Sequence, residues 1–303
     1  MTKTDRNAWI ALPAVILLGA AIAWAGSQGG ASVVGIPIFA LSVALAFAIQ
    51  WLAFIPAYLL QSESFFDLTG SLTYISVAVI AVLLSPVVDG RSILLLALVV
   101  IWAIRLGSFL FRRIRKAGKD SRFDQIKPSF IRFLNAWTVQ GLWVTFTLAA
   151  ALAAITTTTR KELDAFAAIG SLIWALGFAT EVTADIQKSR FRADPKNKGK
   201  FIRTGLWAWS RHPNYFGEIM LWIGVAIIAV PVLRGWQWLT LISPVFVALL
   251  ITRISGVPPL EKQADERWGG QEDYEAYKAR TPVLIPRPPF LRRGLQRPHR
   301  IAL

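Results

Sequence analysis

The chain carries a series of apolar stretches, each about as long as a lipid bilayer is thick. A helix of about 20 apolar residues crosses the hydrocarbon core, and in lipid a helix satisfies all of its own backbone hydrogen bonds. The sequence therefore predicts an all-α fold, a polytopic membrane helix bundle of about seven to eight transmembrane helices. We expect a single integral membrane domain over residues 1–287 and a basic, Pro/Arg-rich, disordered tail over residues 288–303. The apolar stretches run at residues 8–26, 34–60, 70–88, 92–111, 131–156, 164–187, 214–233 and 236–256.

The net charge of +15 is concentrated in a few segments between the apolar stretches. Residues 112–132 hold eight Lys and Arg against two acidic residues, and residues 188–211 hold eight against one. Lys and Arg gather on the cytoplasmic loops of membrane proteins. With eight spans, this pattern places both termini in the cytoplasm and predicts a protein of the bacterial inner membrane. We therefore expect contact with membrane lipids and no binding of nucleic acid.

Cysteine is absent, and the two histidines are His212 and His299. Disulfides and thiolate catalysis are therefore excluded. A His-rich zinc or di-iron centre is not expected, because too few nitrogen ligands are present. We predict no metal site.

Ionisable residues at the ends of membrane spans are candidates for function. The first group is Glu63, Asp67 and Tyr74, at the junction of the second and third spans. Asp67 and Tyr74 are seven residues apart and would share a helix face. A carboxylate and a phenol there could hydrogen-bond a substrate carbonyl and supply a proton. The alternative is a polar turn with a helix cap and an interfacial tyrosine.

Two further groups lie near the same predicted side of the membrane. Arg105 falls within the fourth span and is followed by loop residues Asp120 and Arg122. Glu181 and Asp185 are four residues apart at the end of the sixth span and so share a helix face. The arginine and the carboxylates could line a pocket. They could equally be snorkelling or topology-setting charges that pair with one another.

The fourth group is the run Ser210-Arg211-His212-Pro213-Asn214-Tyr215-Phe216-Gly217-Glu218, where a basic loop enters an apolar span. Pro213 suits the first turn of a helix, because its missing N–H has no helical partner there. Asn214 and Glu218 then share a face, and Gly217 permits the close approach of a neighbour or ligand. A helix N-terminus attracts phosphate, and Arg211 beside it strengthens that attraction.

These motifs together resemble the membrane reductases of the steroid 5α-reductase family, in particular bacterial DUF1295-type proteins. The similarity extends from about Gln61 to Pro286. The resemblance implies an all-helical enzyme that holds NADPH in a cavity open to the cytoplasmic side. It also implies hydride transfer to the activated C=C bond of a lipophilic, steroid-like enone. The matching elements are Asp67-Leu68-Thr69-Gly70, Trp102 to Gly107, Gly118 to Phe123, Gln140-Gly141 and Ser210 to Glu218.

The resemblance also assigns roles to individual residues. Glu63 matches a glutamate that polarises the substrate ketone. A tyrosine is expected where this chain has Trp102, and because an indole is a very poor proton source, Tyr74 or Asp67 is the expected donor instead. The catalytic candidates are thus Glu63, Asp67 and Tyr74. The residues expected to hold NADPH are Arg105, Asp120, Arg122, Glu181, Asp185, Arg192, Lys200, Arg211, His212, Asn214, Tyr215, Glu218 and Arg253.

Two other functions compete with this interpretation. Membrane methyltransferases of the isoprenylcysteine carboxyl methyltransferase type share Arg-His-Pro-x-Tyr-x-Gly and bind S-adenosylmethionine, with Arg253, Glu261 and Glu266 as the downstream match. The other alternative is a lipid-binding membrane protein without catalysis. The abundance of cationic residues favours a ligand that carries phosphates, and therefore the reductase.

Overall fold

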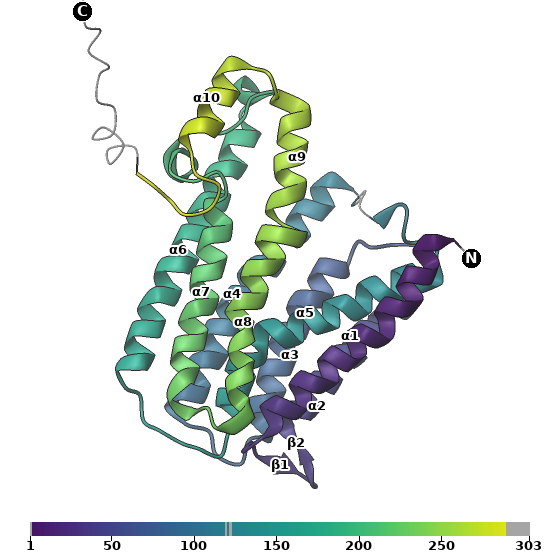
Figure 1. Cartoon of the computed structure of the whole chain (residues 1–303), viewed down its shortest axis with the longest axis vertical. Helices are drawn as coiled ribbons and strands as arrows, with labels where there is room; N and C mark the ends of the chain where they lie inside the picture. The colour runs from purple at the N-terminus through teal and green to yellow at the C-terminus, as the bar shows by residue number, and fades with distance from the viewer. Residues whose placement is uncertain (1, 119, 121–122, 289–303) are drawn as a thin grey trace, which may run out of the picture. The chain divides into compact units, whose positions relative to one another are not determined.

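The structure is a computed structural model that describes residues 2–118, 120 and 123–288. Within this part of the chain, eight helical segments are long and apolar enough to cross a membrane. The prediction of an all-α polytopic bundle is thereby confirmed, and the fold is consistent with an integral membrane protein (Figure 1). The predicted disordered tail lies outside the described residues, apart from residue 288. The eight segments are Lys3–Ser27, Ile38–Leu59, Phe66–Leu84, Gly90–Arg115, Phe130–Thr156, Ala165–Ala193, Pro213–Val232 and Gly235–Trp268.

The chain divides into two compact units. The first contains Met1–Ser171 and Gly224–Phe246, and the second contains Leu172–Ile223 and Val247–Leu303. Three helices are divided between the two units: α6 (Ala165–Ala193), α7 (Pro213–Ala229) and α8 (Ile242–Leu249).

The first unit is organised around its fifth helix. Of the residues in an 18-residue apolar stretch of α5, 78% are buried, against 28–50% in the corresponding stretches of the other spans. The stretch from Ala149 to Ala154 consists of alanines apart from Leu152 and is fully buried, because small side chains allow neighbouring helices to approach closely. The other elements of this unit are α1 (Lys3–Ser27), the antiparallel strands β1 (Ser32–Val33) and β2 (Ile36–Pro37), α2 (Ile38–Leu59), α3 (Phe66–Leu84), α4 (Gly90–Ala117), α5 (Phe130–Thr156), and the 3-10 helices Val230–Val232 and Gly235–Leu241.

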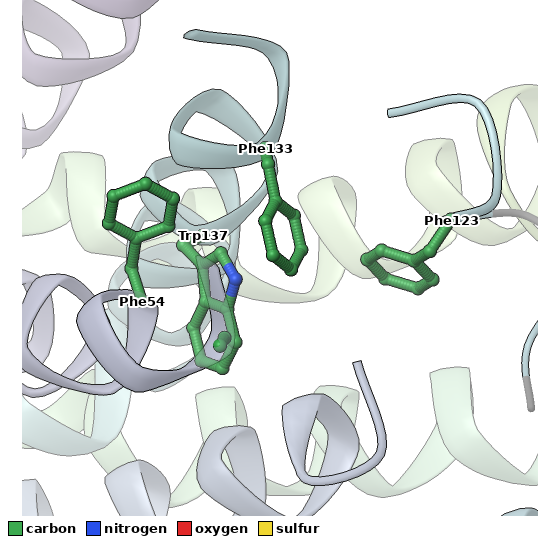
Figure 2. Close-up of a cluster of buried hydrophobic side chains, with 5 residues drawn as sticks. Phe54, Phe123, Phe133 and Trp137 are labelled. Carbon is green, nitrogen blue, oxygen red and sulfur yellow. The ribbon is translucent and has the colours of Figure 1, made fainter. Parts of the chain in front are cut away.

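An aromatic cluster fixes the segment between α4 and α5 (Figure 2). Phe123, from that segment, lies 6.2 Å from Phe133 between ring centroids and 4.9 Å from Phe66 of α3. Phe54 of α2 and Trp137 of α5 complete the cluster. Edge-to-face packing of this kind adds to the stability that burial alone provides.

A buried arginine joins three parts of the first unit. Arg91, at the start of α4, is 1% exposed. Its guanidinium donates hydrogen bonds to the carbonyl oxygens of Ile228 (2.6 Å) and Glu162 (2.9 Å). It also forms an ion pair with Asp164 at 3.1 Å. Burial would raise the pKa of the Asp164 carboxyl, but hydrogen bonds from backbone amides and Arg91 outweigh burial and lower that pKa.

The second unit contains the remaining helical elements. α7 begins at Pro213, as the sequence predicts. The eighth membrane segment is interrupted by a π-helical turn that carries Arg253. Such turns are frequent at functional sites. The elements are the parts of α6, α7 and α8 that fall in this unit, the 3-10 helices Pro195–Asn197 and Gly205–Ala208 between α6 and α7, the π turn Leu250–Ile254, α9 (Val257–Trp268) and α10 (Glu272–Arg280).

Within this unit, α6 and α7 touch through glycines. A β-carbon on Gly217 would lie 2.5 Å from the carbonyl oxygen of Gly177 and 2.7 Å from the amide nitrogen of Glu181. A β-carbon on Gly177 would similarly lie 2.6 Å from the carbonyl oxygen of Gly217. The neighbour that Gly217 admits is therefore helix α6, in the backbone contact that small residues permit between membrane helices.

Candidate functional site

The second unit contains a cavity of about 200 Å³ with cationic and aromatic walls. The end of α6, the segment before α7, and helices α9 and α10 all contribute to it. Its cationic lining residues are Lys188, Arg192, Lys200, Arg211 and Arg267, and its aromatic ones are Phe191, Phe201, Trp207, Trp268, Tyr274 and Tyr277.

The turn that presents Arg211 and His212 is held by the C-terminal segment of the chain. The amide of Arg211 donates to the carbonyl oxygen of Pro282 (2.9 Å), and that of His212 donates to the carbonyl oxygen of Val283 (3.1 Å). The buried hydroxyl of Ser210 donates to the carbonyl oxygen of Leu284 at 2.7 Å. These bonds leave α7 free to begin at the next residue, proline, which needs no N–H partner.

Glu261 of α9 joins the two side chains of this turn. One carboxylate oxygen lies 2.8 Å from Nη1 of Arg211, and the other lies 2.7 Å from Nε2 of His212. Burial lowers the pKa of the His212 imidazole, although the Glu261 carboxylate opposes this shift. The imidazole is therefore neutral at pH 7, with the proton on Nε2 donated to Glu261. Nδ1 is buried and has no hydrogen-bond partner among the described residues.

Lys188 is a cation of the cavity wall for which no salt bridge is found among the described residues, and the Asp185 carboxylate of the same helix acts on it electrostatically. Its ammonium lies 4.3 Å from the centre of the Trp207 ring, a cation–π contact. The indole of Trp207 is fixed in place because its N–H donates to the carbonyl oxygen of Ala184 at 3.0 Å. No ion pair joins Lys188 to another residue that the structure describes. A partly buried ammonium in this state favours an anionic ligand.

Several predicted site residues of the second unit meet at this cavity. Arg192, Lys200, Arg211 and His212 line it. The ring of Tyr215 stacks on that of His212, with centroids 5.6 Å apart and planes at 13°. The other predicted residues of this unit are not part of the cavity wall: Glu181 and Asp185 are buried on α6, Asn214 and Glu218 are partly buried at the start of α7, and Arg253 is exposed.

The predicted residues of the first unit form a separate set of contacts. The carboxylate of Glu63 lies 2.5 Å from the ammonium of Lys127 and accepts a hydrogen bond from the amide of Asp120 at 2.8 Å. Burial would raise the pKa of Glu63, but these two bonds outweigh it and lower the pKa. Glu63 is therefore ionised, and it holds the segment that precedes α5. Arg122 lies outside the described residues.

The other first-unit candidates have partners of their own. Asp67 lies 3.6 Å from the guanidinium of Arg113. Arg105 lies over the ring of Phe109, at 5.5 Å from its centroid. Tyr74 is buried and packs edge-on against Trp102, with ring centroids 5.0 Å apart. The tyrosine of α3 thus lies beside the residue of α4 where the resemblance expects a tyrosine.

Sequence reasoning missed two cations of the cavity, Lys188 and Arg267. In the sequence, Lys188 resembles a topology-setting charge at the end of the sixth span, and Arg267 lies in the polar stretch that follows the eighth. One signal could have identified Lys188, because it precedes Arg192 by four residues and so shares a face of α6 with it. The sequence singles out Glu261 as part of the methyltransferase match and does not predict that it links Arg211 to His212.

Among curated proteins, the chain is similar to the probable O-methyltransferase ustE of Ustilaginoidea virens. The two are 34% identical over 70 residues, which is 23% of this chain. The match spans only a quarter (25%) of the length of that relative. No solved structure matches the chain. The family model described as "Protein of unknown function (DUF1295)" matches residues 53–281, and the chain therefore belongs to the DUF1295 family.

Proposed function

We propose that the protein is an NADPH-dependent membrane oxidoreductase that reduces an activated C=C bond in a lipophilic substrate. The observation that carries this proposal is the cationic cavity, whose wall has five Lys and Arg residues and in which Lys188 forms no salt bridge with another described residue. The residues present fit the coenzyme. Arginine and lysine bind its phosphates, and aromatic rings such as Trp207 and Tyr277 can cover its adenine base.

When bound, NADPH supplies a hydride for the β-carbon of an enone. The chain must then supply a hydrogen-bond donor to the substrate carbonyl, and finally a proton. Glu63 is unsuited to donate that proton, because its carboxyl is already ionised and engaged with Lys127. Asp67 pairs with Arg113. We therefore assign the donor role to the phenol of Tyr74, which is positioned by Trp102.

Replacing Lys188 tests the cofactor site. We expect Lys188→Ala to raise the Kd for NADPH about tenfold or more, because a charge-assisted contact with phosphate is lost. The matched control is Lys262→Ala, since the Lys262 side chain is 80% exposed and its one salt bridge within the described part of the chain is to Glu266. The measurement is a titration of nicotinamide fluorescence with the detergent-purified full chain. Equal NADPH affinity in both variants and the parent protein would remove the site.

Replacing Tyr74 tests the proton donor. We expect Tyr74→Phe to slow NADPH oxidation by about 10²-fold or more with a panel of lipophilic enones, the usual scale for general acid catalysis. The Kd for NADPH should not change, because the hydroxyl does not contact the coenzyme in this scheme. Tyr58→Phe, which alters an aromatic ring pair on α2, is the control. A wild-type rate for Tyr74→Phe would end its assignment as the donor.

Methyl transfer from S-adenosylmethionine is the second candidate, because the matched relative is named a probable O-methyltransferase. That cofactor carries a sulfonium cation and no phosphate, so a wall with five cations suits it less well. Mass spectrometry of small molecules that co-purify with the protein distinguishes the two. Retained S-adenosylmethionine without NADPH would replace the reductase proposal.

A further inference from the structure

A second cavity adjoins the first. It has a volume of about 360 Å³ and lies between the end of α6, the 3-10 turn Pro195–Asn197 and α9. The cations Arg192, Lys200 and Arg267 line both cavities, and Lys198 lines only the second. A single ligand could therefore occupy both cavities and contact the shared cations at their junction.

The turn that carries Lys198 has a defined shape. The Asp194 carboxylate accepts a hydrogen bond from the amide of Lys196 at 2.9 Å, and the Asn197 side chain donates to the carbonyl oxygen of Phe191 at 3.0 Å. Gly199 follows with φ +83°, a conformation that favours glycine. The indole N–H of Trp268 donates to the Gly199 carbonyl oxygen at 2.6 Å. Lys198 is thus held at the cavity by a fixed backbone.

The two cavities suit different parts of a ligand. The first, at about 200 Å³, is smaller than the roughly 300–1,000 Å³ of most ligand sites, so it accommodates only part of a dinucleotide. It has six aromatic side chains, whereas the second has only Phe191 and Trp268, both shared with the first. A planar base therefore favours the first cavity, and a phosphate group favours the second.

Exposure determines which phosphate belongs in the second cavity. All four of its cations are exposed, whereas Arg211 in the first cavity is 13% exposed at its side chain and His212 is buried. The reactive nicotinamide end must be shielded from water. The pyrophosphate connects the two ends of the coenzyme, so it should lie toward the buried side of the first cavity. A phosphate monoester at the opposite end, by contrast, can remain partly hydrated.

We infer that the second cavity binds the 2′-phosphate of the adenosine ribose and so makes the protein select NADPH over NADH. This inference rests on the proposed function, because it presupposes that a dinucleotide occupies the first cavity. It identifies Lys198 as a specificity-determining residue, with Arg192, Lys200 and Arg267 contributing from the shared wall.

The test compares Lys198→Ala with Lys196→Ala, two exposed lysines of the same turn, of which only Lys198 lines the cavity. The Kd values for NADPH and NADH are measured with the full chain in lipid nanodiscs. We expect Lys198→Ala to raise the Kd for NADPH about tenfold and to leave that for NADH unchanged. Lys196→Ala should change neither. As fragment probes, 2′,5′-ADP should displace NADPH more effectively than 5′-ADP.

Three outcomes would overturn the inference while leaving the proposed function intact. These are an equal loss of NADPH and NADH affinity in Lys198→Ala, no loss of either, and equal competition by the two ADP fragments. A Lys198→Ala variant that loses only anionic lipid, with an unchanged coenzyme preference, would also overturn it and assign the cavity to a lipid headgroup. If the parent protein binds neither dinucleotide, the proposed function itself fails.

Discussion

Arg91→Ala is expected to destabilise the protein by about 3 kcal/mol, at the lower end of the range for removing one partner of a buried ion pair. The lower end applies because the Asp164 side chain is 35% exposed, so water can solvate part of its freed charge. The larger loss concerns the carbonyl oxygens of Ile228 and Glu162, which would no longer have a guanidinium donor. Thermal unfolding in detergent measures the effect, with a fall in midpoint on the order of 5 °C or more.

Two companion variants make the Arg91 result interpretable. Arg91→Lys keeps the charge but cannot reach both carbonyl oxygens and Asp164 in the same geometry, so it should recover only part of the stability. Arg203→Ala removes an arginine whose ion pair with Asp273 is more than half exposed on both sides. Such pairs contribute about 0–1 kcal/mol. If Arg91→Ala is no worse than Arg203→Ala, Arg91 does not hold α4 to its neighbours.

Gly217→Val is expected to force α6 and α7 apart and so to abolish NADPH binding. A side chain at this position would overlap the Gly177 carbonyl oxygen and the Glu181 amide, which are backbone atoms that cannot rotate away. Overpacking typically costs about 1–3 kcal/mol, and a backbone clash belongs at the upper end. Because α7 starts at the turn that carries Arg211 and His212, a displaced helix would also move the cavity wall. Thermal unfolding and NADPH titration of the same sample report both effects.

A double-mutant cycle tests whether the glycine contact itself is responsible. Gly177→Ala alone should destabilise the protein, whereas adding it to Gly217→Val should cost little more, because the helices are already separated. Gly90→Ala is the matched control. A β-carbon there would meet only the Leu163 side chain, at the ordinary distance of 3.5 Å. Fully additive effects of Gly177→Ala and Gly217→Val would show that each glycine acts separately.

The spans were predictable because bilayer length and hydropathy are local properties of the sequence. The eight expected apolar stretches all correspond to helical segments, with ends that differ by a few residues at most sites. The eighth is the exception. It continues to Trp268 because α9, although polar, is joined to α8 through a π turn. Hydropathy alone cannot reveal a polar helix that extends an apolar one.

The site was predictable only in part, because charge alone does not indicate whether a residue is buried. Arg91 resembles an ordinary loop charge in the sequence, and its partners lie about 70 and 137 positions further along the chain. Lys188 also resembles a topology signal, and its place beside Trp207 depends on the path of the chain between α6 and α7. By contrast, the turn at Arg211 and His212 was predictable, because proline at a helix start is a local signal.

The bonds that the C-terminal segment makes to Ser210, Arg211 and His212 have a consequence for biosynthesis. The acceptors of these hydrogen bonds are the carbonyl oxygens of Pro282, Val283 and Leu284, which lie more than seventy positions later in the chain. Membrane helices enter the bilayer in order as the ribosome extends the polypeptide, so the early spans can assemble long before this point. Under the proposed function, the ability to hold the coenzyme would then be among the last properties that a newly made molecule acquires, and a chain released prematurely would be inserted without a complete cavity wall.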